Sequence, residues 1–117
     1  MKVVESSDAA AFDGGEVHPV YSTFALGRDA EWTCRLFVIE MKENDEEGIG
    51  TYLNIEHVSP ALCGAIVNFE ATLVSVANNS VICLFEAKVR ERLIAKGETG
   101  QKILKKDKIE SIFNTLK

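Results

Sequence analysis

The stretch STFALGRDAEWTCRLFVIEMKEN, residues 22–44, decides the fold, because it predicts one long helix from Ser22 to about Met41. Apolar residues surround this helix except along a narrow polar edge, which consists of Arg28, Asp29, Arg35 and Lys42. Helical periodicity predicts the deepest face, which consists of Leu26, Ala30, Thr33, Phe37 and Met41. A helix that is apolar nearly all round is buried on most sides, so this helix is expected to lie in the core.

Length and composition limit the fold and the function. A chain of 117 residues with 46% hydrophobic residues is expected to form one domain, residues 1–117, with an ordinary core. The net charge of -5 and the isoelectric point near 5.0 argue against nucleic-acid binding. Basic residues cluster only between Lys88 and Lys108, where acidic residues are interspersed. This mixture favours a solvated face, with a site for a phosphate-bearing ligand as the minor alternative.

The cysteines and the hydropathy indicate the compartment. Cys34, Cys63 and Cys83 show no CxxC spacing and are odd in number, so neither a disulfide framework nor a zinc site is expected. No stretch reaches the roughly 18 apolar residues of a membrane span. The first residues, MKVVESSDAA, do not resemble a signal peptide. We therefore expect a reduced, cytoplasmic protein that does not associate with a membrane.

Turn residues and alternating hydrophobicity divide the rest of the chain. Before the helix we expect, in order, a short edge strand (Lys2–Ser6), an Ala-rich turn (Ser7–Phe12), a glycine turn (Asp13–Gly15) and an extended approach (Glu16–Tyr21). After the helix we expect a charged loop (Lys42–Glu47), four strands (Gly50–Val58, Ala65–Ala77, Ser80–Arg92 and Leu93–Leu104) and a short helix after Asp107. Antiparallel strands curled round one buried helix form the hotdog fold, of the α+β class.

Three polar residues occur where this architecture is expected to be apolar or close-packed: Thr23, Glu31 and His57. Each has a purely structural alternative. Thr23 can be the helix N-cap in place of Ser22. Glu31 can form a surface ion pair with Arg35, four residues on, and His57 can be a satisfied core histidine. Together the three supply a hydroxyl, a carboxylate and an imidazole, which are the groups that acyl transfer requires.

Two stretches carry a family resemblance. The first, FDGGEVHPVYSTFALGRDAEWTC (residues 12–34), places Thr23 after a glycine turn and Glu31 eight residues later. The second, GTYLNIEHVSPALCG (residues 50–64), places His57 seven residues after Gly50. These ordered spacings resemble those of the fluoroacetyl-CoA thioesterase family, a group of hotdog proteins. The similarity extends from residue 2 to residue 106.

The resemblance implies an acyl-CoA thioesterase that uses these three polar residues for catalysis and needs no metal or other cofactor. It also implies that Gly50 and Gly97 lie beside the substrate. Gln101 stands where the family has an arginine, so we expect Gln101 at the acyl pocket and broad activity rather than fluoroacyl selectivity. The segment before Gly14 leaves little room for the helical lid of the best-known member.

Two alternative functions remain open. The first is a catalytically silent hotdog protein that binds acyl-CoA or serves as a structural subunit, because a fold does not determine a function. The second, a hotdog dehydratase, is less favoured, because the ordered Thr, Glu and His differ from a His-led dehydratase motif.

The exposed apolar residues predict a homodimer. Trp32 and Ile39 interrupt the polar edge of the helix, and a five-stranded sheet leaves at least one edge open. A lone subunit would expose both features, so a second copy is expected to cover them. The resemblance implies the same arrangement, because similar hotdog proteins join two sheets and place their active sites at the interface.

Overall fold

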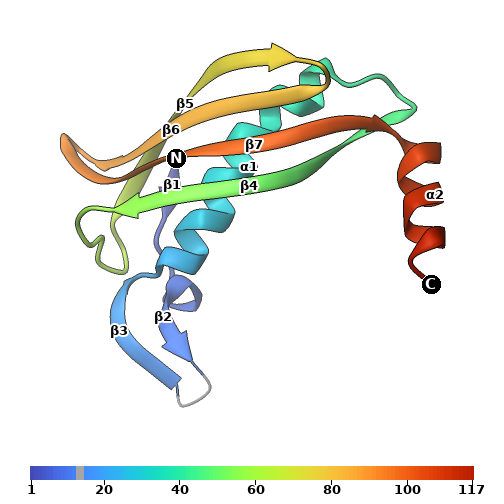
Figure 1. Ribbon diagram of the computed structural model, residues 1–117. Coiled ribbons are helices and arrows are strands. Elements are labelled where there is room, and N and C mark those ends of the chain that lie inside the picture. The colour runs from blue at the N-terminus through green and yellow to red at the C-terminus, as the bar shows by residue number, and fades with distance from the viewer. Residues whose placement is uncertain (13–14) are drawn as a thin grey trace.

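The computed structural model describes residues 1–12 and 15–117, in which a five-stranded antiparallel sheet curls around one long helix (Figure 1). The sheet has the strand order β1-β5-β6-β7-β4, and β2 and β3 form a separate hairpin. The elements in chain order are β1 (Lys2–Val3), the 3₁₀ helix η1 (Ser6–Asp8), β2 (Ala9–Phe12), β3 (Gly15–Tyr21), α1 (Thr23–Met41), β4 (Glu46–His57), β5 (Ile66–Ala77), β6 (Ser80–Val89), β7 (Arg92–Lys105) and α2 (Lys106–Thr115). The predicted α+β class, with its helix before four long strands, is confirmed.

Two expectations about local structure are wrong. Ser7–Phe12 does not form an Ala-rich turn, because η1 is followed by β2, which pairs with β3. Lys42–Glu47 is not all loop, because β4 begins at Glu46, which pairs with β7. Of the expected turn at Asp13–Gly15, only Gly15 is described, and its φ of 107° favours glycine.

Helix α1 packs its small side chains against the concave face of the sheet. Its buried residues are Ala25, Leu26, Gly27, Ala30, Cys34 and Val38. Of the expected deepest face, Thr33, Phe37 and Met41 are only half-buried, so that prediction is partly wrong. The opposite side of α1 is exposed, which contradicts the expectation of a helix buried on most sides. Its exposed apolar residues are Phe24, Trp32, Leu36 and Ile39.

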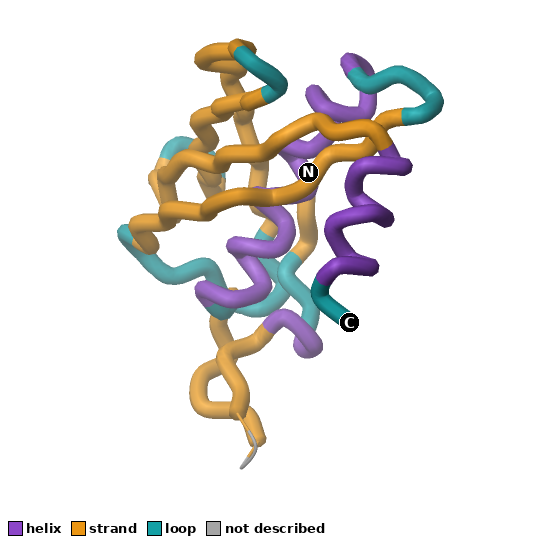
Figure 2. Tube along the Cα trace, turned by 45° about the vertical axis from the view of Figure 1, so that its right-hand side comes forward, coloured by secondary structure: helices purple, strands orange, loops and turns teal. Residues whose placement is uncertain are grey.

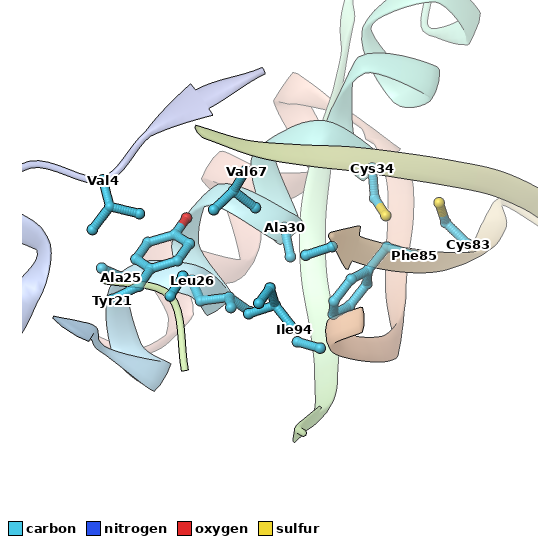
Figure 3. Close-up of a cluster of buried hydrophobic side chains, with 13 residues drawn as sticks. Val4, Tyr21, Ala25, Leu26, Ala30, Cys34, Val67, Cys83, Phe85 and Ile94 are labelled. Atoms are coloured by element: carbon cyan, nitrogen blue, oxygen red, sulfur yellow. The ribbon is translucent and has the colours of Figure 1, made fainter. Parts of the chain in front are cut away.

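The core lies between α1 and the sheet (Figure 3). Phe85 of β6 and Ile94 of β7 fill it below the helix. Cys34 of α1 and Cys83 of β6 are both buried there, and their sulfur atoms face each other (Figure 3). Burial, followed by the hydrogen bond to Cys34, raises the pKa of the Cys83 thiol to about 12. These two cysteines are therefore inert core residues in the folded protein.

A cluster of charged and polar side chains, here called the anchor cluster, fixes the start of α1: Lys2, Asp8, Tyr21, Arg28 and Asp29. The Asp8 carboxylate is 3% exposed and accepts from Lys2 and from Arg28, each at 2.9 Å. Tyr21 donates its hydroxyl proton to Asp29. Burial opposes ionisation of Asp8, but hydrogen bonds from the Glu5 N–H, Lys2 and Arg28 outweigh it and lower its pKa.

Within the described part of the chain, neither α1 nor α2 has the length and hydrophobicity of a membrane-spanning helix.

Candidate active site

One stripe of α1 lies against the edge strand β4, and we call this contact the seam. On α1 the stripe consists of residues spaced four apart, which are Thr23, Gly27, Glu31 and Arg35. Residues four apart lie one above the other on a helix, so these side chains meet β4 in sequence. The two elements run in opposite directions, because Thr23 meets the end of β4 and Arg35 meets its beginning.

The Thr23 hydroxyl lies 3.0 Å from Nδ1 of His57, at the end of β4. Thr23 is free to make this contact because Ser22 is the N-cap, whose hydroxyl accepts the N–H of Ala25 at 2.9 Å. The structural alternative for Thr23 is therefore wrong. Nε2 of His57 is buried and has no hydrogen-bond partner among the described residues, so His57 is not a fully satisfied core histidine.

Glycines set the distance between α1 and β4. A Cβ at Gly27 would lie 2.9 Å from Cδ1 of Ile55, so the helix approaches the strand closely only because this side chain is absent. A glycine inside a helix costs about 1 kcal/mol relative to alanine, which gives Gly27 a packing reason to be there. A Cβ at Gly50 would lie 2.8 Å from Oε1 of Glu31. Gly50 therefore makes room for the Glu31 carboxylate.

The Glu31 carboxylate does not pair with Arg35. Arg35 instead forms an ion pair with Glu47 at 2.7 Å and donates to the carbonyl oxygen of Gly48 at 3.2 Å. The surface ion pair expected as the alternative for Glu31 is therefore wrong. The Glu31 side chain is exposed and remains available to a ligand.

A β-bulge brings the two halves of β4 onto one face. The register with β7 shifts between Gly50 and Tyr52, so Thr51 is the extra residue. Before the bulge, Gly50 faces α1, and after it Ile55 and His57 face α1. A regular strand would place Gly50 and His57 on opposite faces, since they are seven residues apart. Bulges of this kind re-aim side chains beside active sites.

A cleft of about 720 Å³ opens along the seam. Its floor and walls include Thr23, Phe24, Gly27, Glu31, Leu53 and Ile55. Arg28, Trp32 and Arg35 line it as well, and sequence reasoning assigned them no role at the site. Arg28 donates hydrogen bonds to Asp29 and Asp8. The bond to Asp29, followed by that to Asp8, raises the pKa of the guanidinium and keeps it cationic. The spacing of four residues that links Thr23, Gly27, Glu31 and Arg35 was a sequence signal that could have predicted this side of the cleft.

None of the three predicted substrate residues, Gly50, Gly97 and Gln101, lines the cleft within one chain. Gly97 lies beneath the ring of Phe85, whose Cζ would be 2.7 Å from a Cβ at Gly97. Gln101 is 3% exposed and pairs with Gly50 on the neighbouring strand, and its Nε2 has no partner among the described residues. Within residues 1–12 and 15–117, no three His, Cys, Asp or Glu side chains cluster as a metal site would require.

Glu31 and Thr23 line this apolar cleft, whereas His57 does not line it and contacts Thr23 from the end of β4. A carboxylate, a hydroxyl and an imidazole so arranged are suited to acid–base chemistry on an acyl group. The FlK family, described as fluoroacetyl-CoA-specific thioesterase, matches residues 4–107. The chain belongs to this family. The family resemblance expected from the sequence is confirmed, and so is the enzyme class, a thioester hydrolase.

Solved structures agree with this membership. The thioesterase is similar to a thioesterase superfamily member from Thermus thermophilus, with a TM-score of 0.93 and 35% identity over 98% of this chain and 85% of that chain. It also resembles the fluoroacetyl-CoA thioesterase FlK, with a TM-score of 0.86 and 19% identity over 97% and 89% of the two chains. It is also similar to a hot-dog-like protein from Thermanaerovibrio acidaminovorans, with a TM-score of 0.82 and 21% identity over 96% of this chain and 83% of that chain. These likenesses confirm the predicted hotdog fold. The comparison with curated proteins finds no match.

Proposed function

We propose that this thioesterase hydrolyses acyl-CoA with Thr23, Glu31 and His57 as its catalytic residues. The observation that carries the proposal is the 3.0 Å contact between the Thr23 hydroxyl and Nδ1 of His57, beside a cleft that Thr23 and Glu31 line. The three groups come from two elements that run in opposite directions. Gly50 supports the assignment, because it leaves room for the Glu31 carboxylate.

Hydrolysis forms a carbon–oxygen bond at the acyl carbon, breaks the carbon–sulfur bond and places a proton on the CoA sulfur. Glu31 has two possible roles. It removes a proton from the attacking water, or it attacks the carbonyl carbon itself to form an anhydride that water then opens. Both roles require an accessible carboxylate oxygen, and the Glu31 side chain is exposed to the cleft.

Thr23 and His57 manage the oxygen and the proton. Thr23 is the first residue of α1, where backbone N–H groups and the positive end of the helix dipole stabilise the charge that develops on the thioester oxygen. Nδ1 of His57 is engaged by Thr23, whereas Nε2 has no partner among the described residues. We therefore assign Nε2 of His57 as the nitrogen that delivers a proton to the leaving sulfur.

The test is release of free thiol from acyl-CoA substrates of increasing length, with the wild type compared with Glu31→Ala. Glu40→Ala is the matched control, because Glu40 is an exposed glutamate on the same helix. We expect turnover by the wild type and by Glu40→Ala but not by Glu31→Ala. Binding of acyl-CoA without thiol release by the wild type would support the silent acyl-CoA-binding alternative instead.

We propose a broad substrate range, and two substrates test it. The neutral amide of Gln101 stands where the family has a charged arginine, so no strong selection of a fluorinated acyl group is expected. The kcat/KM ratio of fluoroacetyl-CoA to acetyl-CoA, divided by the ratio for uncatalysed hydrolysis, should stay within the roughly 1–3 kcal/mol that one small substituent supplies. A residual preference of several thousandfold would contradict this expectation.

We also propose that the thioesterase is a homodimer. Phe24 and Trp32 are 83% and 56% exposed on α1, and β4 is an edge strand of 12 residues. Exposed apolar residues beside a long open edge favour association with a second copy. Sedimentation equilibrium at micromolar concentration should give twice the chain mass of 12.9 kDa. A monomer under these conditions would exclude the proposal. The expected cytoplasmic location stays a prediction, which cell fractionation would check.

A further inference from the structure

Helix α2 presents an apolar face that the described part of its own chain does not cover. Ile112, Phe113 and Leu116 are 41%, 56% and 78% exposed, and no residue of α2 is buried. The family match ends at residue 107, so almost the whole helix lies beyond it. An amphipathic helix that stands on a sheet end with its apolar side open indicates an interaction surface.

The start of α2 is fixed beside the start of β4. The N–H of Lys106 donates to the carbonyl oxygen of Asp45 at 2.8 Å, and the Lys105 ammonium pairs with the Asp45 carboxylate at 2.9 Å. From there α2 projects beyond the β4 edge of the sheet (Figure 1) and stands apart from α1 (Figure 2). Phe113 shares a hollow of about 300 Å³ with Glu47. Glu47 also bonds Arg35 of α1, so this hollow lies beside the start of β4, at the Arg35 end of the seam.

The free edge of β4 determines what can cover this face. Among the described strands, β4 pairs only with β7, whereas the other edge of the sheet is β1, which has 2 residues. The short strand β1 covers only Ile66 and Val67 of β5, so β5 also has a long free edge, but β4 is the edge strand beside which α2 stands. Two copies of one strand related by a twofold axis pair antiparallel. That pairing brings the partner's His57 end of β4 beside this chain's Glu47 end.

We infer that α2 of each subunit covers the acyl cleft of its partner, with Phe113 against the partner's Phe24. The inference rests on the proposed function and homodimer. Thr23 and Phe24 begin α1 beside His57, so the antiparallel pairing carries the mouth of the partner's cleft toward α2. Phe24 lines the cleft and is 83% exposed, which leaves an apolar surface for α2 to meet. The occupant of the α2 face is a second copy of this chain, and each cleft is completed in trans.

Crosslinking between unlike subunits tests the contact. Cys63→Ser removes the partly accessible native thiol, and Cys34 and Cys83 are buried. One population then carries Phe24→Cys and the other Phe113→Cys, and the two are mixed and treated with a short bismaleimide. We expect a dimer-sized product from the mixture. Ser111→Cys in place of Phe113→Cys is the matched control on the polar face of α2, and it should give little product. Equal yields from both mixtures, or no product, would overturn the inference.

A kinetic measurement separates this inference from the proposed chemistry. Phe113→Ala should lower kcat/KM for the longest accepted acyl-CoA about tenfold, whereas Ser111→Ala should not change it. Crosslinking without thiol release would support the trans cover and defeat the proposed function. Thiol release by a dimer that shows neither the crosslink nor the Phe113→Ala effect would overturn the trans cover alone.

Discussion

The anchor cluster and the seam are two polar groups on the same helix, and they differ in how their side chains are partnered. In the anchor cluster, Asp8 is buried and accepts from two cations, and Tyr21 donates to Asp29. In the seam, Nε2 of His57 has no partner among the described residues, and the Glu31 carboxylate is exposed. Satisfied buried networks make a structure rigid, whereas polar groups left without partners remain available for substrate. We therefore expect changes in the anchor cluster to lower stability and changes in the seam to lower turnover.

The largest expected effect is at the seam. Glu31→Gln and His57→Ala should each lower kcat by at least ~100-fold, because acid–base groups contribute on this scale. Thr23→Ala should cost less, because it removes a positioning contact. All three variants should melt near the wild-type temperature, which differential scanning calorimetry would measure. Wild-type turnover by Glu31→Gln would show that the Glu31 carboxylate of the seam is not a catalytic group.

Removal of the Asp8 carboxylate should lower stability and leave turnover unchanged. Asp8→Ala removes the carboxylate that Lys2 and Arg28 share and should lower the free energy of unfolding by about 2 kcal/mol, the scale of lost hydrogen bonds to a charged group. Urea unfolding would measure this change, and kcat should be retained where the variant is folded. Asp107→Ala is the control, because Asp107 is exposed. Equal stability of the two variants would contradict the assigned role of the anchor cluster.

Gly50→Ala should sharpen the comparison, because it alters the seam without removing a polar group. The added Cβ would lie 2.8 Å from Oε1 of Glu31, and the flexible end of that side chain can move away. We expect turnover to fall about tenfold through displacement of the carboxylate, with little change in stability. A melting temperature that falls while kcat stays unchanged would show that Gly50 serves packing only.

The smallest expected effect is a pH dependence from the anchor cluster. The pKa of Asp8 is lowered in the folded protein from an ordinary value of 3.8. Its contribution to stability is therefore complete well above pH 3.8 and is lost as the pH falls through 3.8 toward the lowered value. The stability difference between wild type and Asp8→Asn should narrow over that range. Urea unfolding of both proteins at several pH values would measure this difference. A difference that stays constant with pH would contradict the lowered pKa.

The sequence predicted those parts of the fold that depend on local patterns. The length of α1 and the alternation in β5 and β6 follow from hydrophobic periodicity, so both were predicted. The hairpin of β2 and β3 was missed, because the run of alanines at Ala9–Ala11 does not alternate. The bulge at Thr51 was also missed, because it is set by pairing with β7, which is distant in sequence.

The same limit applies to the candidate site. Thr23, Glu31 and His57 could be named from residue type and from the family resemblance. Alternation along the strand puts His57 on the same face as Leu53 and Ile55, as the structure does. That Gly50 shares this face could not be derived, because regular alternation puts Gly50 on the opposite side. The partners of Arg35 could not be derived either, because Glu47 and Gly48 come near it only through the fold.

The buried thiols of Cys34 and Cys83 can report the opening of the core, because they become reactive only when the core opens. Neither thiol is accessible in the folded chain, and Cys83 is held far from its reactive thiolate form. A colorimetric thiol reagent therefore labels Cys63 alone in the native protein and all 3 cysteines once α1 leaves the sheet. The rate at which the second and third labels appear gives the free energy of core opening. The reagent that measures CoA release would thus also measure, in the same cuvette, whether a slow variant has lost its chemistry or its structure.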